Sequence, residues 1–417
     1  MLKKTSLLVL IIFASSCGTT HQIKKKFKQH HKESTFLKGF VLYNPTTKKE
    51  IVNHNGNKYF TPASNTKLFT FYTAYKILGD SIKGLEYYKT KDSLIIKGTA
   101  DPSLLYSFES TKTLDFLKTS TDSIYMVDAM IDEVHFGSGW AWDDYPYYFM
   151  PEKSLFPTHS NMLTYIVEND SISSNISALR NNISFSDGFL RRETSENKFY
   201  GKRGENKKYE VPFVTSNKLT AKILSDEIGK KVTLIPNKKY DFKPLYSEKK
   251  DSLLIKLLVD SDNFIAEQLM LQVGKEVSGR YSVKDAIKYS LENYLNDLPQ
   301  VPRWVDGSGL SRYNLFTPND MVHLLGKMYS EIPKEKLFGY FPVGGKSGTI
   351  EKWYGNEKPY VFAKSGSLSN NYNLSGYLVT KKGTMLIFSY MNNHFKESSS
   401  EIKKAMEKTL FEIYNRY

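Results

Sequence analysis

Ser64 and Lys67 stand three residues apart in the stretch TPASNTKLFT, at the point where a proline is followed by an apolar run. A serine hydroxyl becomes a good nucleophile when a neighbouring base removes its proton, and a lysine amine that carries no proton can be that base. The same spacing recurs elsewhere, at Ser195/Lys198, Ser247/Lys250 and Ser400/Lys403. Spacing alone therefore identifies no site, and such a serine taken alone is more often a helix N-cap beside a solvated lysine.

The residues that follow Ser64 give this pair its setting. Apolar side chains recur at helical intervals from Leu68 to Leu78 and stop at Gly79, which predicts a buried helix over this range. Ser64 then lies at the first turn, with Lys67 one turn further along and on the same side. A helix N-terminus also favours negative charge that develops near it.

Two further motifs occupy comparable settings. Ser261-Asp262-Asn263 lies between two stretches with helical periodicity, and Lys364-Ser365-Gly366 ends a predicted strand that leads into a terminal strand pair. Lys346-Ser347-Gly348-Thr349 is an alternative third motif. It follows FPVGG, which is typical of a loop, so we favour Lys364.

The order of these motifs resembles the Ser-x-x-Lys, Ser-x-Asn and Lys-Thr-Gly set of penicillin-binding proteins and serine β-lactamases. The stretch VDGSGLSRYNLFTP (305–318) resembles a signature of the class C penicillin-binding proteins, the D-alanyl-D-alanine carboxypeptidase/endopeptidase family. Further similar stretches are KGTADPSLL, GSGWAWDDYPYYF and NLSGYLVT. The resemblance runs from about residue 36 to the C-terminus and is thin between about 165 and 245.

The resemblance implies a role for each motif residue. Ser64 is the expected nucleophile and Lys67 its base. Ser261 relays a proton to the leaving amine, Asn263 holds a substrate amide, and Lys364 supplies positive charge. Burial and a second cation both lower a lysine pKa, and Lys364 is the candidate for that cation.

The same family implies a set of substrate-binding residues. Ser365, which replaces the family's usual threonine but keeps the hydroxyl, helps to bind a terminal carboxylate together with Gly366 and Ser367. The backbone N–H groups of Ser64 and Ser367 form the expected oxyanion hole. Asp144 resembles a position that meets the amine of the substrate side chain, and a surface turn acid is its alternative.

Other residues of the family signatures have structural interpretations. For Asp306 and Arg312 we favour a buried turn anchored by a salt bridge over direct catalysis. Trp140 and Trp142 are expected in the core.

Composition and charge set the broad class of the protein. The chain has 417 residues, 40% of them hydrophobic and 14% aromatic, enough for a large core and for two or more domains. The formal net charge is +14, with seven lysines among the first 33 residues. The rest of the chain is also positively charged. This charge is compatible with an anionic wall polymer or an acidic peptide as a partner but does not require one, and no nucleic-acid-binding module is recognised.

The N-terminus has the pattern of an export signal. Lys3 and Lys4 precede an apolar run and small residues, and then Cys17, the only cysteine. This ending resembles a bacterial lipobox, in which the cysteine is acylated, although Ala14 stands where leucine is usual. A plain signal peptide is the alternative. We therefore expect an exported, periplasmic, membrane-anchored lipoprotein.

The expected fold class is α+β: a β-lactamase/transpeptidase-like antiparallel sheet packed between helices and split by a strand-rich insertion. The domains expected are a signal peptide (1–17), a basic tether (18–33), a catalytic domain (34–79 and 246–417) and an inserted β-rich region (80–245).

The expected function is that of a serine-type D-alanyl-D-alanine carboxypeptidase and/or D,D-endopeptidase. It acts on peptidoglycan stem peptides through an acyl-enzyme on Ser64 and is acylated by penicillins, with no metal or organic cofactor. One alternative is a β-lactamase, but class A enzymes place their second motif much nearer the first, whereas Ser261 follows about 200 positions after Ser64. The other is a non-catalytic peptidoglycan-binding lipoprotein, which the intact motifs disfavour.

Overall fold

The computed structural model describes residues 35–108, 110–120, 123–188 and 190–417. The expected signal peptide, the tether and Cys17 lie outside the described residues. Within the described ranges, no helix is both long enough and apolar enough to span a membrane.

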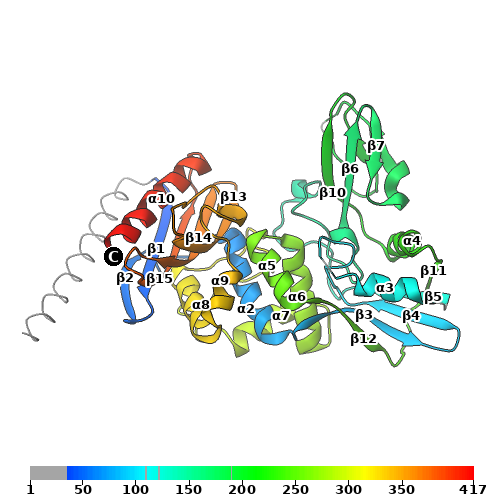
Figure 1. The fold of residues 1–417 in the computed structure, drawn as a ribbon, viewed down its shortest axis with the longest axis horizontal. Helices are drawn as coiled ribbons and strands as arrows, with labels where there is room; N and C mark the ends of the chain where they lie inside the picture. Colours follow the sequence, from blue (N-terminus) through cyan, green and yellow to red (C-terminus); the bar gives the residue numbers. More distant parts are fainter. Residues whose placement is uncertain (1–34, 109, 121–122, 189) are drawn as a thin grey trace, which may run out of the picture.

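One sheet contains both the first and the last strands of the described chain (Figure 1). Its five strands are antiparallel in the order β13-β14-β15-β1-β2. Their bounds are β1 (Leu37–Asn44), β2 (Lys49–His54), β13 (Val361–Leu368), β14 (Asn371–Val379) and β15 (Met385–Asn393). The sheet thus brings the third motif, late in the chain, toward elements that lie near the start of the described chain.

Helices cover both faces of this sheet, so its strands are buried on both sides. Along β15, Phe388 and Tyr390 pack with residues of α10 (Ser399–Arg416), whereas Ile387 and Met391 belong to the core shared with the other helices. This alternation follows the two-residue period of a strand. The α+β fold expected from the sequence, an antiparallel sheet packed between helices, is confirmed.

A block of helices lies on the second face and surrounds α2 (Figure 1). Its members are α2 (Lys67–Ile77), α5 (Lys250–Val259), α6 (Asn263–Ser278), α7 (Val283–Asn293), α8 (Pro318–Glu331) and α9 (Lys334–Gly339). Every residue of α2 from Lys67 to Ala74 is buried, and so is every residue of α6 from Phe264 to Gly274. A helix buried on all sides is a rigid support for a catalytic side chain.

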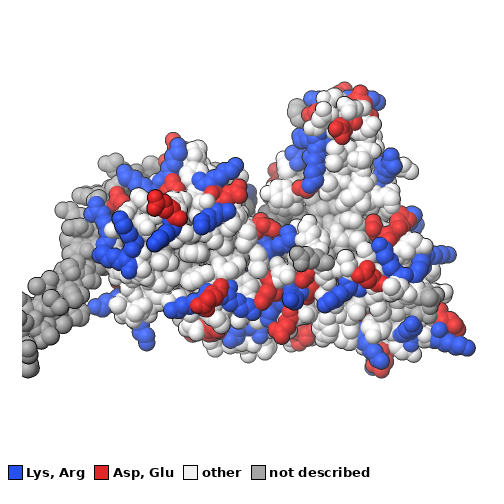
Figure 2. Space-filling model, viewed as in Figure 1, with Lys and Arg blue, Asp and Glu red and all other residues white. Residues whose placement is uncertain are grey.

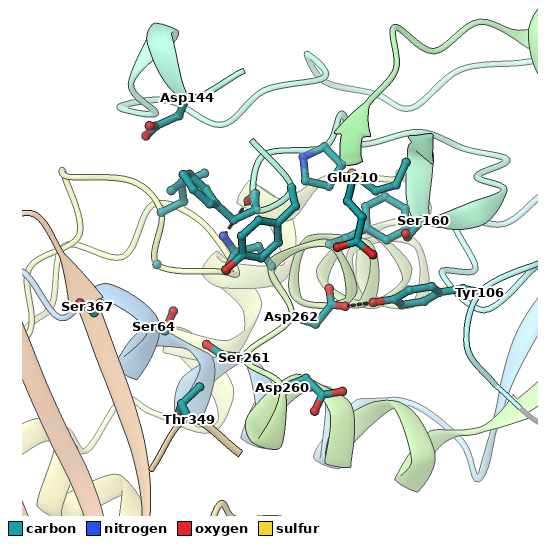
Figure 3. Close-up of a pocket in the computed structure, with 18 of the residues that line it drawn as sticks. Ser64, Tyr106, Asp144, Ser160, Glu210, Asp260, Ser261, Asp262, Thr349 and Ser367 are labelled. Carbon is teal, nitrogen blue, oxygen red and sulfur yellow. Dashed lines mark hydrogen bonds between the residues drawn. The ribbon is translucent and has the colours of Figure 1, made fainter. Parts of the chain in front are cut away.

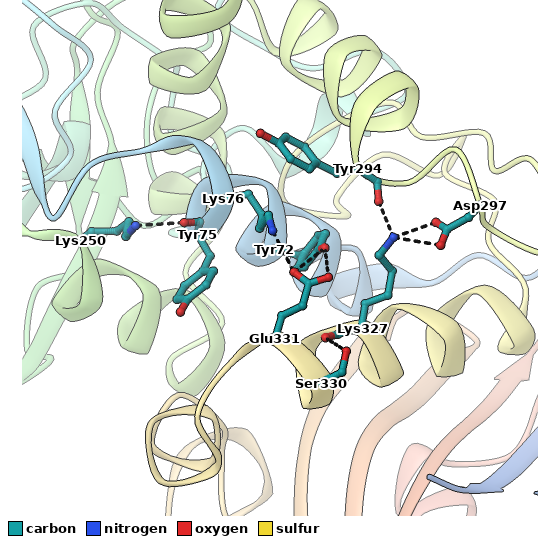
Figure 4. Close-up of polar contacts among 9 residues, drawn as sticks. All are labelled: Tyr72, Tyr75, Lys76, Lys250, Tyr294, Asp297, Lys327, Ser330 and Glu331. Carbon is teal, nitrogen blue, oxygen red and sulfur yellow. Dashed lines mark hydrogen bonds and ion pairs between the residues drawn. The ribbon is translucent and has the colours of Figure 1, made fainter. Parts of the chain in front are cut away.

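Polar contacts fasten the far end of α2 to α8 (Figure 4). The Glu331 carboxylate accepts hydrogen bonds from the Tyr72 hydroxyl at 3.0 Å and from Lys76 Nζ at 2.9 Å. Nearby, Lys327 Nζ on α8 pairs with Asp297 at 2.9 Å. These partly exposed pairs add little to the apolar burial that holds α2 in place.

The chain leaves this unit through β3 (Ser81–Lys89) and returns through β12 (Lys243–Lys249), which pair with each other antiparallel. They belong to a second sheet of order β11-β5-β4-β3-β12, in which β4/β5 and β5/β11 are parallel pairs. The other elements of this layer are β4 (Ser93–Gly98), β5 (Ser123–Asp128), β11 (Val232–Pro236), α3 (Lys112–Thr119) and α4 (Asn217–Ile228). We propose that residues 80–245 are an insertion, although β12 continues past the expected boundary.

A smaller sheet of order β10-β6-β7 forms an upright arm beside the second sheet (Figure 1). Its strands are β6 (Met162–Glu168), β7 (Ser171–Ser174) and β10 (Lys207–Pro212), and a two-stranded pair, β8 (Ile183–Phe185) and β9 (Phe199–Gly201), lies close to them. The arm has its own core, which includes Leu163, Tyr165 and Phe199. A space-filling view shows a deep hollow between this arm and the part that carries α10, with basic and acidic side chains interspersed on the face in view (Figure 2).

Candidate active site

Ser64 lies in a short 3-10 turn, Ala63–Thr66, directly ahead of α2. The sheet holds the segment before this turn. The Thr61 N–H donates to Asn393 Oδ1 at 2.8 Å, and Asn373 Nδ2 donates to the Thr61 carbonyl at 2.9 Å. Ala63 has a left-handed φ of 50°, a costly conformation for an L-residue. Strain of this kind persists where the surrounding structure enforces it, often at a functional site.

Two glycines allow other segments to approach Ser64 closely. A Cβ on Gly366 of β13 would lie 2.4 Å from the Pro62 carbonyl oxygen and 3.0 Å from Ser64 N. A Cβ on Gly309, which has a φ of 82°, would lie 2.0 Å from the Ala63 carbonyl oxygen. Glycine is therefore required at both positions, because any side chain would push the third motif or the DGSGLSR turn away from the serine.

The Lys67 side chain is fully buried, and its amine has three partners. Nζ lies 3.1 Å from Ser64 Oγ, 2.5 Å from Asn263 Oδ1 and 2.7 Å from the Ser308 carbonyl oxygen. A neutral amine has two N–H groups and one lone pair. Because the amide oxygen and the carbonyl accept only, the lone pair of the neutral amine faces the Ser64 hydroxyl.

Burial lowers the pKa of Lys67 to about 8, against the opposing effect of the carboxylates of Asp306, Asp262 and Glu267. Burial is also the largest cause of a pKa of Lys364 well below 10.5, and the charge of Lys67 lowers it further. The positive charges of Lys67 and Lys364 disfavour each other, so their proximity favours a state in which at least one of the two buried amines is neutral.

Lys364 joins the second and third motifs. Its Nζ donates to Ser261 Oγ at 2.8 Å and to the Ser365 carbonyl at 2.8 Å. Ser261 has a left-handed φ of 60°, and Asn263 begins α6 and donates to the Phe149 carbonyl at 2.7 Å. The third motif lies inside the edge strand β13 and not at its end as expected from the sequence, so the pairing of β13 with β14 fixes its register.

Ser64, Ser261 and Asn263 line a cleft of ≈ 830 Å³ between the catalytic sheet, α6 and the arm, whereas the amines of Lys67 and Lys364 are buried beneath its surface. Ser64, Ser261, Ser367 and Thr349 lie around one part of it (Figure 3). Ser365 lines it as well, and its hydroxyl lies 2.6 Å from Thr349 Oγ1. The structure therefore brings together the five proposed catalytic residues and the third-motif hydroxyls.

Asp144 lines the same cleft from a separate loop, away from the Ser64 group (Figure 3). Burial raises its pKa, the neighbouring Asp143 raises it further, and Arg312 lowers it. Arg312 also lines the cleft. Asp144 and Arg312 thus give this part of the cleft two opposite charges.

The DGSGLSR turn is anchored differently from the expected salt bridge. The Asp306 carboxylate accepts from the backbone N–H groups of Gly309 at 2.8 Å and Ser311 at 2.6 Å, and from Trp140 Nε1 at 2.9 Å. These neutral donors take the place of Arg312. Trp142, expected in the core, is 78% exposed, because the loop that contains it turns its indole toward solvent.

Thr349, in the rejected alternative motif, is a site residue that the sequence analysis did not assign. The Lys346-Ser347 half of that motif does lie in a loop, as expected, before the short turn Gly348–Ile350. The signal that identifies Thr349 is its Gly-Thr step ahead of the third motif. Arg312 also lines the cleft. In the sequence, only its place at the end of the DGSGLSR signature suggests that it belongs to the site.

The D-Ala-D-Ala carboxypeptidase 3 (S13) family model matches residues 20–186 and 220–413. The chain belongs to this family. The match covers all three motifs and most of the inserted region. Membership confirms the resemblance seen in the sequence.

Similar proteins agree with this assignment. The chain is 24% identical to the D-alanyl-D-alanine carboxypeptidase DacB of Haemophilus influenzae over 88% of this chain and 87% of that protein. Its fold is similar to the crystal structure of penicillin-binding protein 4 of Haemophilus influenzae, with a TM-score of 0.72 at 22% identity, over 91% and 96% of the two chains. The predatory endopeptidase Bd0816 of Bdellovibrio bacteriovorus is more distant, with a TM-score of 0.52 at 17% identity, over 90% of this chain and 91% of that one.

The S13 family assignment also fixes the class of enzyme. The chain is a serine D-Ala-D-Ala carboxypeptidase of the penicillin-binding type, as expected from its sequence. Family membership does not identify the catalytic side chains. The hydrogen bonds around the Lys67 amine support Ser64 as the nucleophile and Lys67 as its base.

Proposed function

We propose that this S13 enzyme cleaves D-Ala-D-Ala bonds and D-amino-acid crosslinks in peptidoglycan stem peptides, with Ser64 as nucleophile and Lys67 as its base. The observation that carries the proposal is the buried Lys67 amine, whose two carbonyl-type acceptors leave its lone pair for Ser64 Oγ. With a pKa of about 8, roughly one Lys67 amine in ten is neutral at pH 7.

In the acylation step, Ser64 Oγ bonds to the scissile carbonyl carbon while its proton passes to Lys67 Nζ. The oxygen of the tetrahedral intermediate accepts hydrogen bonds from the N–H groups of Ser64 and Ser367. Gly366 supports this arrangement, since only glycine lets β13 approach the Ser64 turn. One such donor typically lowers the barrier by about 3 kcal/mol.

The C–N bond then breaks, and the proton that Lys67 took from Ser64 passes to the leaving amine through Ser261 Oγ, which Lys364 Nζ holds at 2.8 Å. Water afterwards attacks the acyl-enzyme and releases Ser64 and the shortened peptide. Asn263 binds a substrate amide in this proposal, and its contacts with Lys67 Nζ and the Phe149 carbonyl hold its side chain at the cleft.

The carboxylate of the substrate binds at the hydroxyl groups of Ser365 and Thr349, beside Ser367 and the Lys364 amine. An anion bound there favours the protonated form of Lys364 and so offsets the cost of burying it. Asp144 faces the side chain of the third stem residue, at the distant part of the cleft.

Penicillins are expected to acylate the same serine. The penicillin-binding protein 4 of Haemophilus influenzae has been crystallised with a β-lactam, and its fold is similar to that of this chain, with a TM-score of 0.69. We also propose that the chain is exported to the periplasm and anchored to a membrane by a lipid on Cys17.

Digestion of purified muropeptides tests the proposal, with the products identified by mass spectrometry. Wild-type enzyme is expected to remove terminal D-Ala from pentapeptides, to split crosslinked dimers, or to do both. The Ser64→Ala variant is expected to leave both substrates intact. If the wild type binds muropeptides but releases no product, the chain is a wall-binding protein and not a hydrolase.

Rapid turnover of a chromogenic cephalosporin would instead indicate a β-lactamase. The measurement uses the same two proteins and compares the steady-state rate after the first acylation event. We expect one fast equivalent followed by slow turnover, because the acyl-enzyme of a penicillin-binding protein deacylates slowly.

A further inference from the structure

Glu267 is a buried carboxyl group in contact with the backbone that holds Lys67. It lies one helical turn after Asn263 on α6 and is 2% exposed. Its Oε1 accepts a 2.7 Å hydrogen bond from the Ser308 N–H, and the Ser308 carbonyl in turn accepts from Lys67 Nζ at 2.7 Å. Asn263 and Glu267 therefore share one face of α6, and each controls one of the two fixed acceptors of the Lys67 amine.

The second oxygen of Glu267 has an unusual position. Glu267 Oε2 is buried and has no hydrogen-bond partner. The nearby Asp306 carboxylate, in contrast, accepts from several donors, including the N–H groups of Gly309 and Ser311. The two carboxyl groups are thus unequal, and Asp306 is the one whose negative charge is well solvated by the protein.

The charged groups around Glu267 act in opposite directions. Its pKa is raised to about 7, because burial and the charge of Asp306 outweigh the lowering effects of Lys153 and of the hydrogen bond from Ser308. Lys153 is already paired with Glu133. The charge of Glu267 in turn acts on Lys67, whose pKa it raises together with Asp306 and Asp262. Near neutral pH, Glu267 therefore loses its proton over much the same range as Lys67.

We propose that Glu267 is a positioning residue for the catalytic base. Its carboxyl group holds the Ser308 peptide so that the Ser308 carbonyl orients the Lys67 amine toward Ser64. Its loss of a proton adds a third carboxylate next to Lys67 and favours the ammonium form of that lysine. The inference rests on the proposed role of Lys67 as the base. It adds Glu267, one helical turn after Asn263, to the residues of the second motif.

The test uses two substitutions with different chemistry and measures the acylation rate constant with a fluorescent penicillin from about pH 6 to about pH 10. Glu267→Gln keeps an oxygen for the Ser308 N–H but cannot ionise. Removing a negative charge near an ammonium group lowers its pKa, so the rising limb of the pH profile, expected near pH 8 in the wild type, should move down by about half a unit or more. The plateau rate should change little.

Glu267→Ala removes the acceptor and leaves the buried Ser308 N–H without a partner. The plateau acylation rate is expected to fall about tenfold. Glu276→Gln, at an exposed position on the same helix where Glu276 pairs with Lys83, is the matched control and should leave the limb and the plateau unchanged.

A Glu267→Gln profile that overlays the wild-type profile would overturn the proposal, and so would a folded Glu267→Ala variant with the plateau of the wild type. If Glu267→Ala fails to fold, the glutamine profile alone decides. Failure of the proposed function is recognised separately, because then the wild-type protein itself is not labelled on Ser64.

Discussion

Replacing Lys67 by arginine is expected to reduce the rate of penicillin acylation by about 10³-fold, although the positive charge is kept. Arginine stays protonated at all accessible pH values, so it cannot take the Ser64 proton. The Lys67 amine, in contrast, has a pKa of about 8 because it is buried, and a useful fraction is neutral at pH 7. The rate is measured by quenching the reaction with fluorescent penicillin at increasing times.

The matched control is Lys76→Arg, at the exposed end of the same helix. Lys76 pairs with Glu331 far from the cleft, and its replacement should leave acylation unchanged. Thermal melting of both variants shows that the fold is kept. If folded Lys67→Arg is acylated within about threefold of the wild-type rate, Lys67 is not the base.

Replacing Lys364 by methionine is expected to have two opposite effects. Acylation should slow by about 10²-fold or more, because Ser261 loses its donor and the substrate carboxylate its cation. The melting temperature should rise by about 3 °C or more, since an apolar side chain replaces a buried amine whose partners are neutral oxygen atoms. Calorimetry and the penicillin assay measure the two effects on one sample.

The pH dependence of this stabilisation has a definite sign. The pKa of Lys364 in the folded protein is lowered well below 10.5, so the unfolded chain holds a proton that the folded chain releases. The contribution of Lys364 to the stability of the wild type therefore rises with pH between the lowered pKa and 10.5. The advantage of Lys364→Met should narrow as the pH approaches 10.5. Lys346→Met, an exposed lysine in the similar loop motif, is the control; an equal gain there would contradict the explanation by burial.

Short-range patterns in the sequence predicted the parts of the site that depend on one element each. The helical period after Ser64 indicated a buried helix that begins near this serine, and the helices on either side of Ser261-Asp262-Asn263 were predicted in the same way. In each case the determining interactions lie within about ten residues of one another.

Features that depend on distant contacts were missed. The parallel pairing of β5 with β4 and β11 joins segments that are far apart in the chain, and no local pattern distinguishes it from an antiparallel hairpin. The partners of Asp306 come from its own turn and from Trp140, a residue in the inserted region. The sequence motif led us to expect that the charged Arg312 would pair with Asp306. Backbone N–H groups and the Trp140 indole N–H instead donate to this carboxylate.

The Lys67 environment was predicted only in outline. Burial was expected to lower its pKa, but the sequence gives no sign that three carboxylates oppose this effect. Glu267 is visible in the sequence only as an acidic residue four positions after Asn263. Its contact with Ser308 requires the DGSGLSR turn to fold against α6.

Mass spectrometry of the intact protein after incubation with penicillin tests most directly whether Ser64 is the nucleophile. The wild type and Ser195→Ala, a serine from another Ser-x-x-Lys spacing, are each expected to gain the mass of one penicilloyl group. Peptide mapping should place that group on Ser64, and Ser64→Ala should gain no mass. Stoichiometric acylation of a folded Ser64→Ala protein would contradict this mechanism.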